Sequence, residues 1–212
     1  MNMLLCRTVF AGLILLFLVP PVTHAEESPA YVQAFFGGLQ TLQADFDQQV
    51  IDANNKTIQS SRGHMWIRRP GRFRWDYSTP YRQQLIADGE HLWSYDEDLE
   101  QVTVQPAAEV LTSTPAMLLS GNEPLEKVFH IEAVEMQDND QHVRLTPISD
   151  DSNVIELHLF FSAGMLARIE AQDSFGNTTT FSFTHLERNP KLDEGVFSFT
   201  PPAGADVVGD LQ

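Results

Sequence analysis

The sequence predicts a mainly β, α+β protein in which a large, curved antiparallel sheet carries a few short helices on one side. Apolar and polar residues alternate in about ten short segments, as in strands that have one buried face. Turns rich in Asp, Asn, Gly and Ser separate these segments, and helical spacing appears in two places. Such a succession favours an antiparallel meander. A sheet that curls without closing leaves a concave apolar face, which helices could cover to enclose a cavity.

The first 25 residues have the layout of a secretory signal peptide. Arg7 supplies a positive charge, an unbroken apolar run extends from Val9 to Val19, and prolines and small residues lead to Ala25. The run is too short to span a bilayer comfortably, which disfavours a membrane anchor. We therefore expect cleavage after Ala25. We also expect a single mature domain over residues 26–212, because no linker, repeat or low-complexity segment divides it.

The first half of the mature chain is predicted to begin with a helix and to continue as strands. Apolar residues spaced by three and four indicate an amphipathic helix from Ala30 to Leu42, weakened by Gly37 and Gly38. Alternation starts at Ala44. A hairpin turn is expected at Asp52 to Lys56, and strands are expected at Met65 to Arg68, around Phe73 to Tyr77, at Gln83 to Ala87, at His91 to Tyr95 and at Glu100 to Gln105.

The stretch "RRPGRFRWDY", residues 68–77, concentrates four arginines in an acidic chain. Alternation separates its two kinds of side chain, because Phe73 and Trp75 fall on one face of a strand while Arg72 and Arg74 fall on the other. We expect Arg72 and Arg74 to solubilise the outer face of that strand.

Two short helices are expected next, at Pro106 to Leu111 and at Thr114 to Ser120. Thr114 is the expected N-cap of the second helix, and Gly121 is its expected stop. Alternation then resumes, and five further strands are predicted at Val128 to Met136, His142 to Ile148, Val154 to Phe161, Met165 to Ala171 and Thr178 to His185.

Charge and cysteine content exclude several classes of protein. The chain has a net charge of −16, and such a surface repels phosphate backbones, so no nucleic acid partner is expected. The single cysteine, Cys6, precedes the apolar run and is lost on cleavage. The mature chain is therefore expected to have no disulfide, no thiolate zinc site and no lipid anchor of its own.

No sequence pattern indicates catalysis. The chain contains no phosphate-binding glycine loop, nucleophile elbow or paired-histidine metal helix, so we expect neither an enzyme nor a cofactor nor a metal. The mature histidines lack metal-ligand spacing and are expected to be surface or strand residues without a shared site: His64, His91, His130, His142, His158 and His185.

Four segments in order, "MWIRRPGRFRW", "LIADGEHLWSYDEDLEQVTVQ", "LTSTPAMLLSG" and "FSFTPPAGADVV", resemble the periplasmic lipoprotein carrier family, LolA. The resemblance covers nearly the whole mature chain. It implies an incomplete, curved antiparallel β-barrel that encloses a hydrophobic cavity under a lid of short helices. It also implies a monomeric periplasmic chaperone without enzymatic activity.

Such a carrier accepts outer-membrane lipoproteins from an ATP-driven release complex of the inner membrane, LolCDE-like, in a Gram-negative cell. It delivers them to an acceptor lipoprotein of the outer membrane, LolB-like. The resemblance assigns Arg69 the role of a latch that hydrogen-bonds the lid backbone and stabilises the closed, empty form. Phe73 matches an aromatic residue that receives and retains cargo, and Phe36 matches an apolar lid position. Together with the alternation of residues, this gives a predicted ligand-binding set of Phe36, Trp66, Phe73, Trp75 and Leu118.

Other functions remain open at this point. A carrier of free lipids or glycolipids would need the same apolar cavity, which cannot by itself distinguish acyl chains of different origin. An outer-membrane acceptor of the same fold would need a cysteine directly after the signal peptide, and residues 20–30 contain none. An enzyme acting on acyl chains would need a recognisable nucleophile and base.

Overall fold

The computed structural model describes residues 29–107, 115–121, 123–134, 140–149 and 152–209. The expected signal peptide, most of the helix expected at Pro106 to Leu111, and the N-cap Thr114 lie outside these residues. Among the helices of the described residues, none combines the length and apolar character that a membrane crossing requires.

Within these residues, twelve strands form one sheet, in the order β12-β6-β5-β4-β3-β2-β1-β11-β10-β9-β8-β7. Neighbouring strands run antiparallel except β12, which pairs in parallel with β6. In chain order the strands are β1 (Thr41–Ile51), β2 (Thr57–Arg68), β3 (Arg72–Thr79), β4 (Gln83–Ala87), β5 (His91–Asp96), β6 (Gln101–Pro106), β7 (Phe129–Val134), β8 (Gln141–Pro147), β9 (Val154–Ser162), β10 (Met165–Asp173), β11 (Thr178–Arg188) and β12 (Asp206–Gly209).

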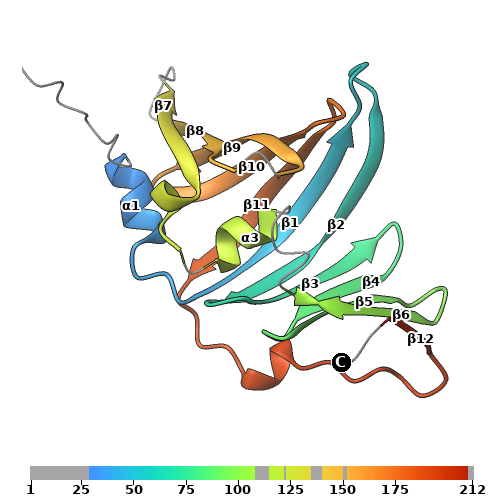
Figure 1. Cartoon of the computed structure of the whole chain (residues 1–212). Coiled ribbons are helices and arrows are strands. Elements are labelled where there is room, and N and C mark those ends of the chain that lie inside the picture. The colour runs from blue at the N-terminus through green and yellow to red at the C-terminus, as the bar shows by residue number, and fades with distance from the viewer. Residues whose placement is uncertain (1–28, 108–114, 122, 135–139, 150–151, 210–212) are drawn as a thin grey trace, which may run out of the picture.

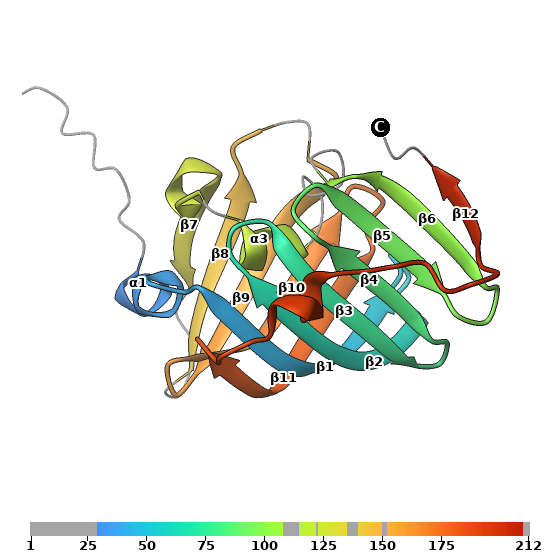
Figure 2. The same cartoon turned by 90° about the horizontal axis from the view of Figure 1, so that it is seen from below.

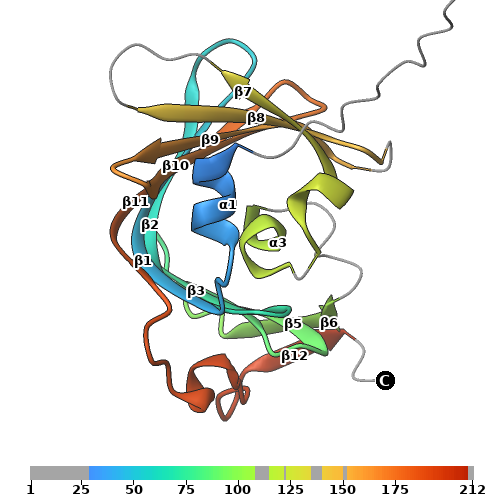
Figure 3. The same cartoon turned by 90° about the vertical axis from the view of Figure 1, so that its left-hand side faces the viewer.

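The sheet curves around two helices, α1 (Ala30–Phe36) and α3 (Pro115–Ser120), which lie on its concave side (Figure 3). The edge strands β7 and β12 stand at opposite ends of the strand order and do not pair with each other. The sheet is thus an incomplete barrel, and Figure 1 shows it open. The predicted fold class is confirmed for the curved antiparallel sheet and its few helices. We call the concave face the interior face.

The first helix is shorter than predicted. It ends at Phe36, where Gly37 adopts an extended backbone, and Gly38 has a φ of +68°. A positive φ suits glycine and interrupts a right-handed helix, so the chain turns there. Leu39 and Leu42, which the helical spacing included, are buried in the turn and at the start of β1. The apolar period therefore extended past the helix because a strand with one buried face follows it directly.

Most predicted strands are present, with bounds that differ by a few residues. The turn at Asp52 to Lys56 is confirmed, since the Asp52 carboxylate accepts the backbone N–H groups of Asn54 and Lys56 at 2.9 Å each. On one side of that turn, β2 begins at Thr57, well before the predicted Met65. Strand β12 and two 3-10 helices, η2 (Leu125–Lys127) and η3 (Glu194–Phe197), were not predicted from the sequence.

Residues 189–200 run across the outer face of the sheet, and we call them the C-terminal strap (Figure 2). Phe197 is buried, and Phe199 contacts the rings of Trp93 and Tyr95 at 5.6 and 5.9 Å between centroids. The strap thereby covers an apolar cluster on the outer face, separate from the cluster on the interior face. It then leads to β12 at the edge of the sheet.

Candidate functional site

The interior face is a continuous apolar surface that the helices cover. Its buried cluster joins Val32 and Phe35 of α1 with Leu118 and Leu119 of α3 and with side chains from every strand of the sheet except β6 and β12. The sheet contributes aromatic rings and aliphatic side chains alike, including Leu42, Phe46, Met65, Ile67, Phe73, Trp75, Leu145, Leu159, Phe161, Ile169 and Phe181. An apolar surface made from a rigid sheet and two short helices can bind an apolar ligand if the helices move aside.

Four of the five predicted ligand-binding residues lie at this surface. Phe73, Trp75 and Leu118 are buried in the interior cluster, and Phe36 is partly buried against it. The ring of Trp75 packs against Phe46 at 5.3 Å between centroids. Their role in binding a ligand stays a prediction.

The fifth prediction, which placed Trp66 at the interior face, is wrong. Its neighbours Met65 and Ile67 are fully buried, so alternation directs Trp66 to the outer face of β2. There its ring lies 4.2 Å from the ring of His64 and beneath the guanidinium of Arg74, 6.0 Å from it. A shift of one residue in the alternation is enough to move a strand residue from one face of the sheet to the other.

Aromatic residues elsewhere in the interior cluster were missed. Phe35 and Phe161 are fully buried and contact each other at 5.6 Å, and Phe181 lies 4.9 Å from Trp75. The signal was present, since Phe35 fits the helical period with Val32 and Phe161 alternates with Leu159. Periodicity alone did not show which of the many strand faces meet at one place.

Arg69 connects the sheet to α3. Its Nε donates to the carbonyl of Leu119 at 2.8 Å, and its Nη2 donates to the carbonyl of Leu118 at 3.2 Å. The guanidinium also lies over the ring of Phe36, 5.4 Å from its centroid. Burial lowers the pKa of Arg69 from its usual value, although a guanidinium stays charged at neutral pH. One side chain thus contacts both helices that cover the interior face.

The turn between β2 and β3 adds a backbone contact to the same helix end. The N–H of Gly71 donates to the carbonyl of Ser120 at 2.9 Å, and the N–H of Arg69 donates to the carbonyl of Gln40 at 2.8 Å. The last carbonyls of a helix have no partner within the helix. Arg69 and Gly71 therefore satisfy three carbonyls at the C-terminal end of α3 and fix where that end lies.

A pocket of about 300 Å³ opens next to this contact. Val32, Phe36 and Gly37 line it from α1 and its C-cap, Arg69 lines it from the sheet, and residues 123–126 close it from the far side. The pocket marks an incompletely packed junction between α1, Arg69 and the segment after α3.

The remaining arginines of "RRPGRFRWDY" hold the C-terminal strap, which corrects the expectation that Arg72 and Arg74 solubilise the outer face. Arg68 forms an ion pair with Glu194 and donates to the carbonyl of Leu192 at 2.7 Å. Arg72 donates to the carboxylate of Glu194 at 3.2 Å. Arg74 donates to the carbonyl of Val196 at 3.5 Å and also pairs with Asp76 at 2.8 Å.

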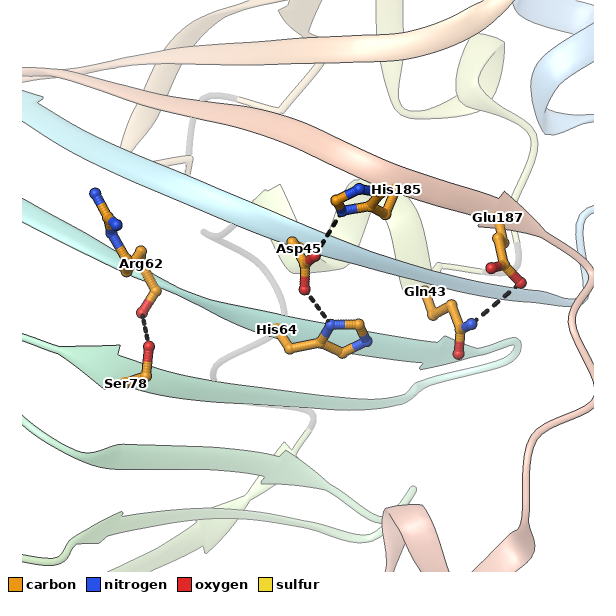
Figure 4. Close-up of polar contacts among 7 residues, drawn as sticks. All are labelled: Gln43, Asp45, Arg62, His64, Ser78, His185 and Glu187. Atoms are coloured by element: carbon orange, nitrogen blue, oxygen red, sulfur yellow. Dashed lines mark hydrogen bonds and ion pairs between the residues drawn. The ribbon is translucent and has the colours of Figure 1, made fainter.

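The sheet brings together two pairs of histidines that lie on different strands, which their sequence spacing did not indicate. Asp45 of β1 accepts from His64 of β2 at 2.6 Å and from His185 of β11 at 2.9 Å, as Figure 4 shows. These hydrogen bonds lower the pKa of the Asp45 carboxyl. On β8 and β9, His142 and His158 lie 2.7 Å apart through Nε2 and Nδ1. Over the described part of the chain, no three or more His, Cys, Asp and Glu side chains are grouped so that they could hold a metal ion.

The sequence is similar to that of proteins described as outer-membrane lipoprotein carriers. The family model "Outer membrane lipoprotein carrier protein LolA" matches residues 37–200. An outer-membrane lipoprotein carrier protein of Methylobacillus flagellatus is 39% identical over 200 residues, covering 94% of this chain and 97% of its own. The protein of that name from Dechloromonas aromatica is 42% identical over 193 residues, covering 91% and 92%.

A solved structure supports the fold independently. An uncharacterized conserved protein of Thermus thermophilus has a TM-score of 0.52, with 12% identity, and the match covers 84% of this chain and 96% of that one. At this identity the likeness concerns the fold alone. Because the family model spans most of the sequence and the relatives align over almost their whole length, the chain belongs to the LolA family of outer membrane lipoprotein carrier proteins.

Proposed function

We propose that this protein is a periplasmic chaperone that binds the acyl chains of outer-membrane lipoproteins and carries them from the inner to the outer membrane. The observation that carries the proposal is the apolar interior face, together with α3, which covers it and is held through Arg69. The relatives named outer-membrane lipoprotein carrier protein support the same conclusion.

A carrier is needed because acyl chains cannot cross water unprotected. Each methylene that leaves an apolar environment for water costs about 0.8 kcal/mol of free energy. The transfer of several long acyl chains through water therefore costs some tens of kcal/mol. An apolar interior removes this barrier by replacing the membrane interior with a protein interior. The carrier must also release its cargo, so the empty, closed form has to compete with the loaded form.

The closed form has an identifiable source of stability. Hydrogen bonds from a charged donor contribute about 1.5 to 3 kcal/mol each, and Arg69 makes two to α3. Leu118 and Leu119 also stay buried only while α3 covers the interior face. Cargo that enters must displace these contacts, which keeps its apparent affinity moderate.

The proposal extends to partners and location. The protein accepts lipoproteins from an inner-membrane, ATP-driven release complex and delivers them to an acceptor lipoprotein on the outer membrane. It reaches the periplasm through a signal peptide cleaved after Ala25, works as a monomer, and performs no chemical step of its own. Cleavage at this position gives a mature chain that begins Glu26-Glu27, which an intact-mass measurement can check.

The test is to purify the protein from the periplasm and to identify bound molecules by mass spectrometry. Lipoproteins are the expected cargo, and recovery of free glycolipid alone would contradict the lipoprotein assignment. Phe73→Glu places an unpaired charge on the interior face, so cargo recovery should fall by more than the stability of the fold does, which unfolding of the same variant measures. Phe175→Glu is the matched control, because Phe175 is 82% exposed at a hairpin tip, and should bind cargo normally.

A further inference from the structure

Two neutral hydrogen-bond donors are buried in or beside the apolar interior without a partner among the described residues. They are the indole Nε1 of Trp75 and the hydroxyl Oγ of Ser120, and neither forms a hydrogen bond with a described residue. The other buried side-chain atoms without such a partner are an acceptor, Gln48 Oε1, and the Nε atoms of two charged side chains, Arg168 and Arg188. Trp75 is 4% exposed and Ser120 is 1% exposed, so bulk water does not reach either group in the closed form. Buried polar atoms are usually paired, and an unpaired one destabilises the fold. Their persistence calls for a partner that arrives with a ligand.

Both groups lie where a ligand would enter. Trp75 belongs to the interior cluster, between the rings of Phe46 and Phe181. Ser120 is the last residue of α3, and its own carbonyl accepts the N–H of Gly71 at 2.9 Å. Displacement of α3 would therefore free the hydroxyl of Ser120, while Trp75 belongs to the interior face on which a ligand would lie.

The type of group indicates the chemistry of its partner. An indole N–H can only donate, and a serine hydroxyl can donate as well as accept. Both are neutral, so in an apolar surrounding they suit a neutral acceptor better than a charged headgroup, which would require a cation beside it. Every acyl chain carries such an acceptor in the carbonyl oxygen of its ester or amide linkage. The hydrocarbon part of the chain has none. An ester also has a bridging oxygen, which an ether lipid keeps, so the carbonyl group is what distinguishes the two.

We propose that Trp75 Nε1–H and Ser120 Oγ–H are hydrogen-bond donors to the carbonyl groups of bound acyl chains. The interior then selects acyl esters and amides over ether lipids and plain hydrocarbons of the same length. This inference rests on the carrier function proposed above and adds a specificity that apolar packing cannot supply. It also explains why buried donors persist in an otherwise apolar cluster.

The experiment compares two lipids that differ in their carbonyl groups alone. Dipalmitoylglycerol carries two ester carbonyls, and dihexadecylglycerol carries ether linkages in their place. Each lipid displaces an environment-sensitive fluorophore from the mature protein, and the midpoints give relative affinities. The unaltered protein should bind the ester about two- to tenfold more tightly than the ether, the range expected for one hydrogen bond.

Trp75→Phe should abolish that preference, because it removes the N–H and keeps an aromatic ring. Any loss of packing will weaken the binding of both lipids equally, so the ratio of the ester affinity to the ether affinity isolates the contribution of the hydrogen bond. The thermal midpoint of the empty variant should not fall by the amount expected for a lost hydrogen bond, because the N–H has no partner in the closed form. Ser120→Ala is a second, independent variant that should reduce the ratio without changing ether binding.

Trp66→Phe is the matched control, since Trp66 lies on the outer face of the neighbouring strand, and it should keep the ester preference. Equal affinities of the unaltered protein for ester and ether would overturn the assignment of the donors and leave the carrier function standing. An undiminished preference in both Trp75→Phe and Ser120→Ala would overturn it as well. Failure of the protein to bind either lipid would contradict the carrier function itself.

Discussion

Arg69 acts on both helices that cover the interior face, through two carbonyls of α3 and the ring of Phe36 on α1. A guanidinium presents several N–H donors in a fixed plane, so one side chain can hold two carbonyls at once. These bonds exist in the closed form, and cargo must displace α3 to reach the face beneath it. Under the proposed carrier function, Arg69 is therefore expected to set the balance between closed and loaded forms without contacting cargo.

Arg69→Leu should produce a carrier that loads and does not release. The variant loses the donors and gains apolar surface beside the interior face, so apparent affinity for cargo rises about tenfold for each 1.4 kcal/mol removed from the closed form. In a reconstituted transfer assay it should accept lipoprotein normally and pass little to the acceptor. Arg62→Leu is the control, because Arg62 pairs with Asp47 on the exposed outer face, and it should transfer at the unaltered rate. A folded Arg69→Leu variant that fails to load would contradict the latch.

The roles of single residues could be predicted only where sequence neighbours determine them. Alternation correctly separated Phe73 from Arg72, because it depends on adjacent positions. The partners of Arg68, Arg72 and Arg74 lie more than a hundred positions away, in the C-terminal strap, so no local pattern could show them. The role of Arg69 came from family resemblance, since neither charge nor spacing distinguishes it from Arg68.

His142 is a buried ionisable residue outside the interior face. Its ring stacks on Phe160 at 4.3 Å, and its Nε2 meets His158, which in turn contacts Glu156 at 2.6 Å. Burial lowers the pKa of His142, and the charges of His158, Arg168 and Arg144 lower it further, while Glu156 opposes them. The folded protein therefore favours the neutral imidazole.

The stability of the fold should consequently decrease as the pH falls. A histidine with a lowered pKa in the folded state contributes stability above its unfolded pKa, near 6.5, and loses it as the pH falls through the folded value. His142→Phe keeps the ring stack and cannot titrate, so its stability should fall less steeply between about pH 7 and pH 5. Urea unfolding at a series of pH values measures the slope. His130→Phe, at an exposed position of β7, should retain the original slope, and an unchanged slope for His142→Phe would exclude His142 as its source.

Among the structural elements, the C-terminal strap is one whose position no local sequence pattern predicts. Strands of the meander were predictable because alternation and a following turn are both local. The strap has no period of its own, and η3 is a single short turn. Its order depends on Arg68 and Arg72 holding Glu194, and on Phe197, which is buried beneath the guanidinium of Arg68. β12 was missed for the same reason, since four residues paired in parallel with β6 leave little pattern.

Phe197→Ala should destabilise the protein by about 3–5 kcal/mol, the usual cost of removing a buried phenylalanine ring. Phe197 is 2% exposed, and its loss also removes the aromatic partner of Arg68. Thermal or urea unfolding of the mature protein gives the change in free energy. Phe175→Ala makes the same substitution at a position that is 82% exposed, and it should change stability by less than about 0.5 kcal/mol. Equal effects of the two substitutions would mean that the strap does not pack in solution as it does in the structure.

In the described part of the molecule, continuous ladders of backbone hydrogen bonds hold the sheet together, whereas side-chain contacts and apolar packing hold the two helices against it. Strand β1 pairs with β2 and β11 along nearly its full length, so movement of the sheet would break many hydrogen bonds together. By contrast, the end of α3 is joined to the sheet by Arg69 and Gly71. Loading should therefore displace the helices and leave the sheet intact. The open sheet was predictable from sequence, but this division depends on contacts between distant segments.

Hydrogen exchange can test whether loading opens the molecule in this way. The N–H of Gly71 donates to Ser120, so it reports directly on whether α3 is in place. Exchange at Gly71 should accelerate when the protein binds an acyl lipid, because α3 moves and its carbonyl is lost as an acceptor. Amides in the middle of β1 should exchange at the same slow rate with and without lipid, because their partners on β2 and β11 remain.

The same measurement on Arg69→Leu without lipid separates opening from the direct effect of cargo. If Arg69 holds α3, the empty variant should already show fast exchange at Gly71, and lipid should add little. Amides of β1 should again be unaffected, as should the amide of Asn55, which donates to Asp52 in the distant hairpin turn. Acceleration in β1 as large as that at Gly71 would show that the barrel itself spreads on loading. In that case the interior face would be exposed by movement of strands, and Arg69 would influence cargo by a route other than the position of α3.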